Sequence, residues 1–439
     1  MRRLAGIVVT LAVALAWAPA ASGLPPIRHV FVIWMENKDY AETFAQDNPK
    51  APYLAKTLPA MGALLPEYYG IAHHSLANYI AVVSGQGPNP YTQADAPVYT
   101  DFMPATAGPD GQAMGAGSVY PTSVLTIADQ LEAKGMTWKG YMEDMGQACR
   151  HPELNQPDDT QNARKDDQYA ARHNPFVYFH SIIDGPSCAQ NDVDLKQMPG
   201  DIAAASTTAN YIFITPDLCS DGHDEPCIDG RPGGLKSIDD FLKEWVPKIL
   251  DSPGYKDDGL LVISFDEADK DDAACCGEKA ANTPAAGGES GGPGGGKIGA
   301  VLISPFIKPG TVDKTSYNHY SFLRTTEDLF GLQHLGYAGV DGLVPIGDKT
   351  FTDPSPKLDL SVKAQRRNAD HVRFSIDTER PATITFGGVC RSAGKRLTGL
   401  NGTLTVTVRH SRRGSCPITA SRDAWQPATR SFKLRKPRR

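Results

Sequence analysis

The chain has 439 residues, a hydrophobic content of 41% and a mean hydropathy of −0.33, as expected of a soluble protein with room for two or more domains. Beyond the N-terminus no stretch is long and apolar enough to span a bilayer, which excludes a multispanning membrane protein. The formal net charge of −6 hides an asymmetry, because the residues from 361 onward carry +14 and the remainder −20. This polarity predicts two modules with different surfaces.

The N-terminus has the features of a secretory signal peptide over residues 1–23. A basic start is followed by an apolar stretch at residues 4–17, and Ala18-Pro19-Ala20 fits a small-residue cleavage site. The apolar stretch is too short for a comfortable membrane span, although an uncleaved anchor is the alternative. We therefore expect a secreted, extracellular or cell-envelope-associated protein.

Export would place the eight cysteines in an oxidising compartment, where an even number favours disulfides. Cys390 and Cys416 are alone in the C-terminal part and are predicted to pair. The other six could form up to three bridges whose connectivity stays open: Cys149, Cys188, Cys219, Cys227, Cys275 and Cys276. A zinc site is the alternative, but no C-x-x-C spacing supports it.

Short apolar runs alternate with helix-like segments over residues 26–355. The runs predicted as buried strands lie at residues 29–34, 138–142, 211–215, 260–265 and 299–304, and the helix-like segments include residues 123–134 and 237–250. Such alternation predicts an α/β layered domain around a central, mostly parallel sheet. Ligands of open α/β sheets bind beyond the carboxyl ends of the strands, so the residues that follow these runs are the candidates for function.

Two of the predicted strands end in acidic motifs. Met35-Glu36-Asn37-Lys38 follows the first strand, and Asp266-Glu267 follows the strand at residues 260–265. If these ends converge, three carboxylates and an amide oxygen would repel one another unless a cation lay among them. Hard oxygen ligands suit Mg, Ca or Mn. The alternative is that each acid caps a helix or faces water.

Ser75 lies in the motif His74-Ser75-Leu76-Ala77-Asn78-Tyr79, at a predicted strand-to-helix turn. The N–H groups at the start of a helix favour an anion there. A nearby metal, rather than a histidine base, could activate the Ser75 hydroxyl as a nucleophile. The alternative is a plain helix-capping serine.

Two further segments carry potential ligands at the boundaries of predicted elements. Residues 215–224 follow a strand and contain Asp217, Asp221 and His223. His319 opens the helical run at residues 321–330. An isolated histidine is usually a polar or core residue, but the boundary positions are where sites are built.

The C-terminal residues 360–439 predict a small basic β-sandwich closed by Cys390 and Cys416. Strand-like alternation occurs at residues 372–376, 383–386 and 404–408. The basic module could attach to an anionic envelope or lipid surface, or its last residues could simply be a solvated tail. We expect no specific nucleic-acid partner.

As an ordered set, these motifs resemble the bacterial secreted phosphoesterase family, which groups acid phosphatases, including phosphatidylinositol phosphatases, with non-specific phospholipases C. That family belongs to the alkaline-phosphatase-like superfamily, and the resemblance covers about residues 28–335. The motifs that carry it are Met35-Glu36-Asn37, residues 74–79, residues 217–224, Phe265-Asp266-Glu267, residues 303–310 and residues 317–321.

The resemblance implies an alkaline-phosphatase-like layered domain and a role for each site residue. It implies a divalent metal (Mg, Ca, Mn or Zn) bound by Glu36, Asn37, Asp266 and Glu267. It implies Ser75 as the nucleophile, with His74 and Asn78 binding the substrate. Asp217 and Asp221 would be further metal ligands, and His223 and His319 would bind phosphate or protonate the leaving group.

We accordingly predict a secreted, metal-dependent hydrolase of phosphate monoesters, similar to acid phosphatases, whose substrate could be a phosphoinositide or another lipid phosphate. The first alternative is a phosphodiesterase of the phospholipase C type, although members of that branch tend to be longer and to carry tandem β modules. The second alternative is an inactive envelope-binding protein whose basic module is the working part.

Overall fold

The computed structural model describes residues 24–44, 48–288, 292–353, 355–368, 370–378, 380–398, 402–410 and 412–435. The signal peptide predicted at residues 1–23 lies outside the described residues. Within the described part of the chain, no helix is both long and apolar enough to cross a membrane.

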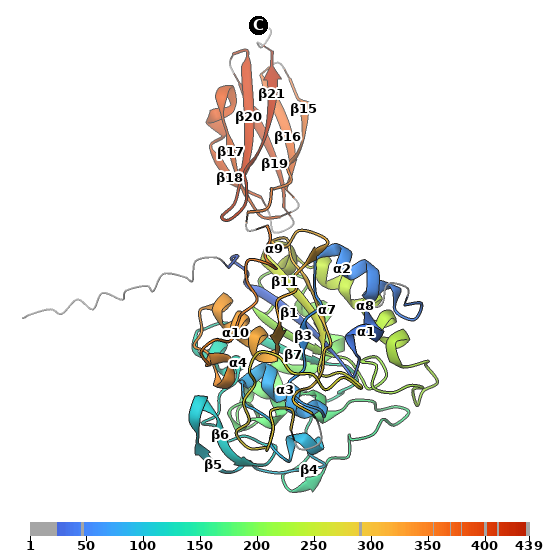
Figure 1. Cartoon of the computed structure of the whole chain (residues 1–439). Coiled ribbons are helices and arrows are strands. Elements are labelled where there is room, and N and C mark those ends of the chain that lie inside the picture. Colours follow the sequence, from blue (N-terminus) through green and yellow to red (C-terminus); the bar gives the residue numbers. More distant parts are fainter. Residues whose placement is uncertain are drawn as a thin grey trace, which may run out of the picture.

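An eight-stranded mixed sheet forms the centre of the larger module (Figure 1). Its order is β13 (Thr311–Val312), β2 (Ala63–Leu65), β12 (Ala300–Ile303), β11 (Gly259–Phe265), β1 (His29–Met35), β10 (Tyr211–Thr215), β7 (Trp138–Met142) and β9 (Asp192–Asp194). Only β12 runs against the others in this sheet, since it is antiparallel to both β11 and β2. The predicted α/β architecture with a mostly parallel sheet is therefore confirmed.

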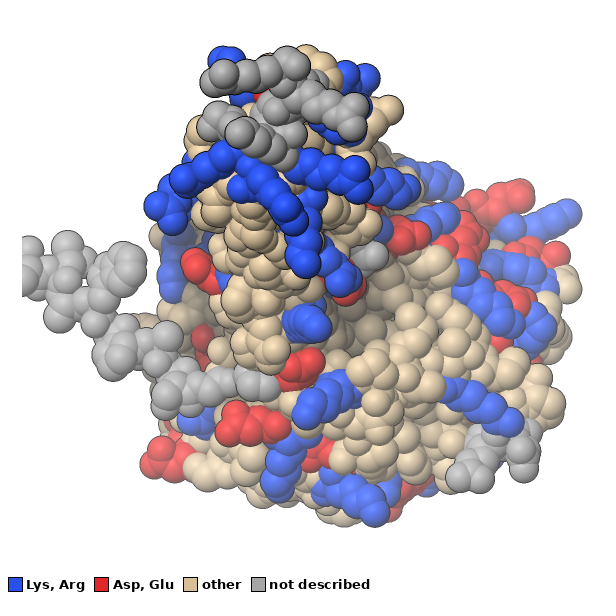
Figure 2. Space-filling view, turned by 90° about the horizontal axis from the view of Figure 1, so that it is seen from above, with Lys and Arg blue, Asp and Glu red and all other residues tan. Residues whose placement is uncertain are grey.

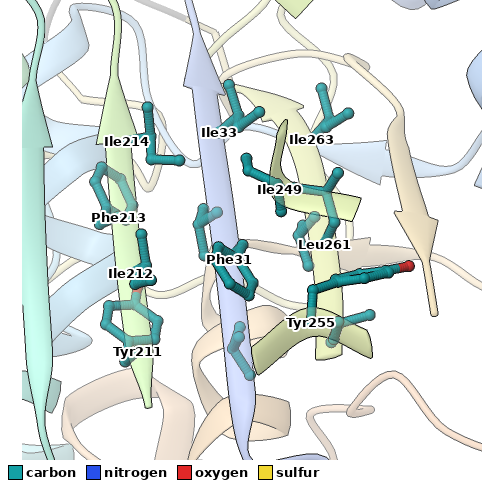
Figure 3. Packing of buried hydrophobic residues seen from close by; sticks show 14 of the residues in the cluster. Phe31, Ile33, Tyr211, Ile212, Phe213, Ile214, Ile249, Tyr255, Leu261 and Ile263 are labelled. Atoms are coloured by element: carbon teal, nitrogen blue, oxygen red, sulfur yellow. The ribbon is translucent and has the colours of Figure 1, made fainter. Parts of the chain in front are cut away.

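The three central strands, β1, β10 and β11, are buried along their whole length. Helices cover both faces: α8 (Gly234–Asp251) and α9 (Pro253–Asp258) on one, α3 (Ser75–Ser84) and α10 (His319–Phe330) on the other. Alternate residues of β1 serve the two faces, as the pleat of a strand requires. Phe31 packs edge-on against Tyr255 of α9 (Figure 3). On the other face, Trp34 stacks on Phe322 of α10.

The remaining elements are short and lie around this core. The helices are α1 (Tyr40–Thr43), α2 (Leu58–Met61), α4 (Ile127–Ala133), α5 (His180–Ile183), α6 (Pro186–Asn191) and α7 (Met198–Asp201). The strands are β3 (Tyr68–Tyr69), β4 (Val98–Tyr99), β5 (Met103–Ala107), β6 (Ala113–Ala116), β8 (Gln156–Pro157) and β14 (Tyr317–Asn318). Helix α4 is shorter than the helix predicted at residues 123–134, because a capping box formed by Thr126 and Asp129 starts it there.

The C-terminal residues form two small antiparallel sheets at the end of the molecule (Figure 1). One contains β15 (Ser361–Arg366), β16 (His371–Asp377) and β19 (Thr403–Arg409), and the other β18 (Lys395–Leu397), β17 (Thr383–Phe386), β20 (Gly414–Ser421) and β21 (Ala428–Leu434). The all-β character of this part is therefore as predicted. Trp425 packs against Phe306 of the larger module with ring centroids 5.7 Å apart.

All eight cysteines are paired, and the predicted bridge between Cys390 and Cys416 is confirmed. The structure also decides the connectivity that the sequence left open: Cys149–Cys188, Cys219–Cys227 and the adjacent pair Cys275–Cys276.

Candidate active site

The carboxyl ends of β1 and β11 lie side by side because the two strands are parallel and Met35 is paired with Phe265. The next residues, Glu36 and Asp266, therefore leave the sheet together, and both are fully buried. The Asn37 amide donates to Asp266 Oδ1 at 3.0 Å, which joins the two motifs directly. The convergence expected from the two acidic strand ends is thus present in the structure.

Ser75 is the first residue of α3 and points at this pair of acids. It follows His74, whose φ of 76° turns the chain sharply into the helix. The Ser75 hydroxyl donates to Glu36 Oε2 at 2.7 Å, and the Tyr79 hydroxyl donates to Glu36 Oε1 at 2.6 Å. Ser75 and Tyr79 are four residues apart on α3, so one helix face presents both hydroxyls to one carboxylate.

Asp221 and His173 complete the cluster from two other segments. The Asp221 carbonyl oxygen accepts from the Glu36 amide at 3.0 Å, and the Asp221 carboxylate lies 3.1 Å from His173 Nδ1. The His173 ring stacks on Tyr79, with centroids 5.3 Å apart and planes within 5°. Glu36, His173 and Asp221 each offer a ligand atom, and these atoms lie within 4.8 Å of one another.

The donor set fits a divalent cation. In the described part of the chain, the buried Asp266 Oδ2 and the buried His173 Nε2 make no hydrogen bond, although His173 Nε2 lies 3.5 Å from Glu36 Oε2. Buried carboxylates without a positive partner are costly, so an arrangement with unused lone pairs around a common centre favours a bound cation. Carboxylates together with one imidazole are ligands used for Zn, Mn and similar metals.

The pKa shifts report the same crowding of negative charge. Burial, followed by the charges of Asp266 and Asp221, raises the pKa of Glu36 well above its ordinary value. Burial raises the pKa of Asp266 to about 6 and that of Asp221 well above the usual range. Burial also holds the pKa of His173 well below its ordinary value, so its imidazole is neutral and able to act as a ligand.

Other predicted site residues hold the turn before α3. Glu267 accepts from the His74 amide at 2.9 and 3.0 Å and lies 2.6 Å from His73 Nδ1. The Asn78 side chain accepts from the amides of Ile71 and Ala72 and donates to the Ala72 carbonyl oxygen. The polar atoms of Glu267 and Asn78 are therefore engaged with the backbone segment that precedes Ser75. These contacts fix the conformation of the turn that carries Ser75.

Asn37 and His74 lie at the edge of the cluster. Asn37 Nδ2 donates to Glu36 Oε2 at 2.9 Å, which orients that carboxylate. The His74 side chain is 43% exposed and lies 3.7 Å from the Asp95 carboxylate, on the solvent side of the turn. Asp95 also accepts from the Leu76 amide in the first turn of α3.

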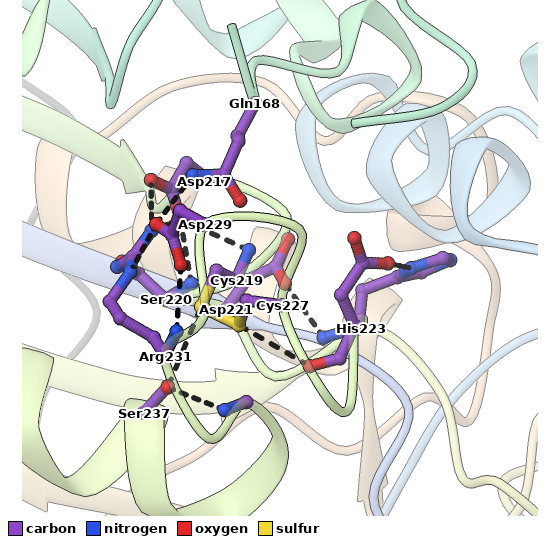
Figure 4. The surroundings of a disulfide bond; sticks show 12 residues. Gln168, Asp217, Cys219, Ser220, Asp221, His223, Cys227, Asp229, Arg231 and Ser237 are labelled. Atoms are coloured by element: carbon purple, nitrogen blue, oxygen red, sulfur yellow. Dashed lines mark hydrogen bonds and ion pairs between the residues drawn. A yellow bond between two sulfur atoms is a disulfide. The ribbon is translucent and has the colours of Figure 1, made fainter. Parts of the chain in front are cut away.

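The structure does not bring Asp217 into the cluster as a ligand. Its carboxylate pairs with Arg231 at 3.0 Å and accepts from the amides of Cys219 and Ser220, so it closes the loop after β10 (Figure 4). The physical reason is that the side chain turns back into its own loop, where backbone donors and Arg231 satisfy it.

His319 also has a different place from the one expected. It is fully buried, and its Nε2 lies 2.6 Å from the main-chain oxygen of Asp266. Burial lowers the pKa of His319 to about 3. It is therefore neutral, and its Nε2 is engaged with the main chain that carries Asp266.

His223 faces outward beside the cluster. Its Nδ1 lies 2.8 Å from Asp224, and its Nε2 lies 3.2 Å from a guanidinium nitrogen of Arg172. Arginine has only donors, so His223 Nε2 is the acceptor in this contact. His223 is thereby oriented by both neighbours beside the cluster.

Arg172 and His173 were missed by the sequence reasoning. They lie in a single 3₁₀ turn at Ala171–His173, which no apolar strand run precedes. Tyr79 could have been recognised, since it is one helical turn after Ser75 and faces the same way. No comparable local signal marks His173, because only its tertiary contacts with Tyr79 and Asp221 bring it to the site.

A serine at a helix N-terminus beside a buried, cation-ready group of carboxylates and an imidazole is an arrangement suited to phosphoryl transfer. The model of the Phosphoesterase family matches residues 47–333, and the chain belongs to this family. The matched residues include Ser75, His173, Asp221 and Asp266.

Curated relatives include phosphatases from fungi and a bacterium. An acid phosphatase of Aspergillus fumigatus is 25% identical over 330 residues, which are 73% of this chain and 59% of the relative. A phosphate-repressible acid phosphatase of Penicillium chrysogenum is 27% identical over 77% of this chain and 68% of its own length. A phosphatidylinositol-3-phosphatase of Mycobacterium tuberculosis is 24% identical over 73% of this chain and 82% of its own length.

These relatives qualify the resemblance in two ways. Fungal proteins are among them, so the restriction to bacteria in our expectation is not supported. The chain spans about three fifths of the length of the Aspergillus fumigatus relative.

Among solved structures, a protein in the alkaline phosphatase superfamily from Vibrio parahaemolyticus aligns over 95% of this chain and 87% of its own, with 12% identity and a TM-score of 0.45.

Proposed function

We propose that this protein hydrolyses phosphate monoesters, in the manner of an acid phosphatase, with Ser75 as the nucleophile. The observation that carries the proposal is the 2.7 Å hydrogen bond from the Ser75 hydroxyl to Glu36, inside a buried cluster with a cation-fitting donor set. Membership of the Phosphoesterase family and the acid phosphatases among its relatives support the same class of reaction.

The residues proposed to hold a divalent cation are Glu36, His173, Asp221 and Asp266. This set keeps Glu36, Asp266 and Asp221 from the sequence expectation, adds His173, and gives Asn37, Glu267 and Asp217 supporting roles. When bound, the cation would neutralise the carboxylates, favour ionisation of the serine hydroxyl and offset charge on the phosphoryl group.

The chemistry assigned to the chain's own residues has two steps. In the first, Ser75 Oγ forms a bond to phosphorus as the bond from phosphorus to the ester oxygen breaks, and the proton that the Ser75 hydroxyl loses is balanced by the proton that the departing alcohol takes up. In the second, a water oxygen forms a bond to phosphorus as the bond from Ser75 Oγ to phosphorus breaks, one proton of the water returns to Ser75 Oγ, and phosphate leaves. Glu36 directs the Ser75 hydroxyl before the attack, and the N-terminus of α3 stabilises the anionic phosphoryl oxygens.

The supporting shell explains why Ser75 can be held in place. Glu267, Asn78 and Asp95 bind backbone amides on both sides of Ser75, and Tyr79 holds the second oxygen of Glu36. Phosphoryl transfer depends mainly on position and charge, so such a shell is the protein's main contribution.

We also propose that the protein is exported. The support is the pairing of all eight cysteines, since disulfides persist in oxidising compartments and are rare in the cytosol.

The nucleophile is tested by Ser75→Ala, assayed with p-nitrophenyl phosphate. We expect kcat to fall by at least about a thousandfold, the scale of loss seen when a catalytic nucleophile is removed. Ser84→Ala is the matched control, because Ser84 is the last residue of the same helix and its hydroxyl bonds only within the chain's own backbone nearby. Activity of Ser75→Ala within about tenfold of wild type, which is a difference of about 1.4 kcal/mol in activation free energy, would show that Ser75 is not the nucleophile.

The reaction class is tested with a panel of phosphate monoesters and diesters, with and without a chelator. Hydrolysis of monoesters that stops on chelation and returns with a divalent metal supports the proposal. Release of diacylglycerol and phosphocholine from phosphatidylcholine would favour the phospholipase C alternative instead. An absence of turnover with every ester and metal would favour an inactive binding protein.

A further inference from the structure

A pocket of about 580 Å³ opens beside the cluster, at the side of His223. Its lining consists of Gln161, Asn162, Ala163, Leu218, His223, Asp224, Glu225, Pro226, Cys227 and Ile228. Two segments thus form its walls: the loop after β10, which also carries Asp221, and residues 161–163.

The pocket adjoins the cluster through His223, which lines the pocket, and His173, which belongs to the cluster. The ring of His223 lies 5.8 Å from the ring of His173, centroid to centroid. Arg172 connects the two walls, since its guanidinium contacts His223 Nε2 at 3.2 Å and donates to the Gln161 carbonyl oxygen at 2.9 Å. The volume is far more than one phosphoryl group fills and falls within the range of about 300–1,000 Å³ typical of ligand sites. It therefore suits the organic part of an ester whose phosphate lies at Ser75.

The wall formed by the loop after β10 is held rigidly. The disulfide Cys219–Cys227 closes it, and the ion pair between Asp217 and Arg231 ties its two ends together (Figure 4). Figure 4 shows Asp221 and His223 on this same cross-linked loop, so the pocket and one candidate metal ligand share a single support. A wall of this kind is preorganised, which favours selectivity between substrates.

The polar lining is built from carboxylate and amide side chains and the His223 imidazole. Asp224 and Glu225 bring carboxylates, and Gln161 and Asn162 bring amide groups. Leu218 and Ile228 add apolar surface, and Ile228 is 56% exposed. Such a mixture matches a sugar-like molecule, whose hydroxyls donate to carboxylates while its C–H face packs on apolar side chains.

The same lining disfavours two other kinds of substrate. Among the described residues that line the pocket there is no Phe, Tyr or Trp on which a nucleobase could stack, and no Lys or Arg to bind a second phosphate. Lys50 pairs with Glu225 at 3.0 Å from outside the lining and offsets part of the negative charge. Arg172 lies behind the walls, 3% exposed and bonded to Gln161 and His223, so the carboxylates of Asp224 and Glu225 are the charges in the lining itself.

We propose that this pocket binds the alcohol part of the substrate and selects a hydroxyl-rich alcohol that carries no second phosphate, that is, a sugar or polyol monophosphate. The inference rests on the proposed phosphomonoesterase function and deepens it. It distinguishes this chain from enzymes built for phosphoinositides, whose additional phosphodiester would meet the carboxylates of the pocket.

The test compares kcat/KM for fructose 6-phosphate and fructose 1,6-bisphosphate, which differ by one phosphate, with AMP and a short-chain phosphatidylinositol 3-phosphate as further substrates. We expect fructose 6-phosphate to exceed the bisphosphate by about tenfold at low salt, the scale of charge repulsion over several ångströms in a wet site, and to exceed AMP. Added salt should narrow the difference between the sugar phosphates.

The variant Glu225→Lys should reduce the ratio of kcat/KM for fructose 6-phosphate to kcat/KM for fructose 1,6-bisphosphate by at least about fivefold, because it reverses a charge in the lining. Glu244→Lys on α8 is the matched control, since it makes the same change of charge at an exposed position outside the pocket. Should Glu225→Lys fail to fold, Glu225→Gln gives the same comparison with half the change of charge. The ratio, rather than the activity, is the readout, so a general loss of stability does not mimic the effect.

Equal kcat/KM values for the two sugar phosphates, a preference for AMP or the phosphoinositide, or a ratio that Glu225→Lys leaves unchanged would each overturn the pocket assignment. In those cases p-nitrophenyl phosphate would still be hydrolysed and the proposed function would stand. If p-nitrophenyl phosphate and all the other monoesters were inert, the proposed function itself would fail.

Discussion

Glu36 has an unusual environment for a glutamate, because it is fully buried and its nearest charged neighbours are other acids. Its two oxygens accept hydrogen bonds from Ser75, Asn37 and Tyr79, which partly replace water. Those bonds favour the ionised carboxylate, but burial and the charges of Asp266 and Asp221 outweigh them and raise its pKa. The cluster is thus stable as a set of carboxylates only when something positive is present.

Replacing Asp266 by Asn should separate the two consequences of this crowding. The change removes one charge from the cluster, so the metal-free protein should melt no lower than wild type. It also removes a proposed ligand, so the rise in Tm on adding a divalent metal should shrink and activity should fall with it. Differential scanning fluorimetry with chelator and with added metal measures both effects.

Asp251→Asn is the control for this comparison, because Asp251 is an exposed acid at the end of α8 and its pair with Lys256 is on the surface. A metal-free Asp266→Asn protein that melts well below wild type would show that Asp266 does not suffer repulsion. An unchanged metal response would show that it is not a ligand.

The stability of the metal-free protein should depend on pH in a direction that follows from Asp266. Its pKa is about 6 in the folded protein and about 3.9 in an unfolded chain, so the folded state binds the extra proton. The stabilisation of the folded state by protonation of Asp266 is therefore complete below about pH 4 and is lost as the pH rises through 6.

Urea unfolding in the presence of chelator, at pH 5 and at pH 7.5, measures this contribution when wild type is compared with Asp266→Asn. The variant should gain stability relative to wild type at the higher pH. With excess divalent metal the trend should reverse, because protons compete with the metal for the same oxygens. A difference between the two proteins that is independent of pH would contradict the shifted pKa.

At the scale of elements, the loop after β10 shows how one segment separates two kinds of acid. Asp221 points to Glu36 and His173, whereas Asp217, four residues earlier, is turned toward Arg231 and the backbone of its own loop. The disulfide Cys219–Cys227 holds the loop between them. Both acids follow the same strand, yet only one reaches the cluster.

Comparing Asp217→Asn with Asp221→Asn tests this division of roles. Asp217→Asn keeps an oxygen for the amides of Cys219 and Ser220 and loses mainly the pair with the half-exposed Arg231, so it should cost no more than about 1 kcal/mol. The metal concentration that gives half-maximal activity should stay within about threefold of wild type for Asp217→Asn. For Asp221→Asn it should rise at least about tenfold, which corresponds to a loss of about 1.4 kcal/mol of metal-binding free energy. Metal titrations of activity, combined with urea unfolding, give both quantities. Equal metal requirements for the two variants would restore Asp217 as a candidate ligand.

At the scale of the whole molecule, positive charge gathers on the C-terminal module. Figure 2 shows Lys and Arg side chains crowded over this part, while acidic and basic side chains mix over the larger module. The contacts between this module and the larger one include Trp425 on Phe306 and an ion pair between Arg422 and Asp257. Attachment of this module to an anionic envelope or lipid surface stays a prediction.

We expect the intact protein to bind vesicles that contain phosphatidylglycerol and to leave neutral phosphatidylcholine vesicles unbound in a sedimentation assay. Binding should weaken several-fold between about 50 and 500 mM salt, since the Debye length shortens below about 10 Å. The double change Lys363→Glu and Lys433→Glu should reduce it further, while Lys196→Glu with Lys236→Glu in the larger module should not. Binding that ignores salt, or that both double variants reduce equally, would exclude a specific role of the C-terminal module.

Much of the fold and part of the candidate site could be predicted from the sequence. The strand runs at residues 29–34 and 260–265 predicted the central strands β1 and β11, because buried parallel strands leave continuous apolar segments. Acids directly after parallel runs lie at the same edge of the sheet, so Glu36 and Asp266 could be predicted as candidates, and the pairing of β1 with β11 brings them together. The pair Cys390–Cys416 and the all-β C-terminal part followed from composition and alternation.

Only the tertiary structure decided which polar side chains face the cluster. The sequence shows that Asp217, Asp221 and His319 lie at element boundaries, but the direction of each side chain depends on the local partners: Arg231 for Asp217, and the Asp266 carbonyl oxygen for His319. His173 has no periodic pattern around it and reaches the site through packing on Tyr79. Strand ends are encoded by local periodicity, whereas ligand geometry and the neighbouring pocket arise from contacts between distant segments, which no local pattern records.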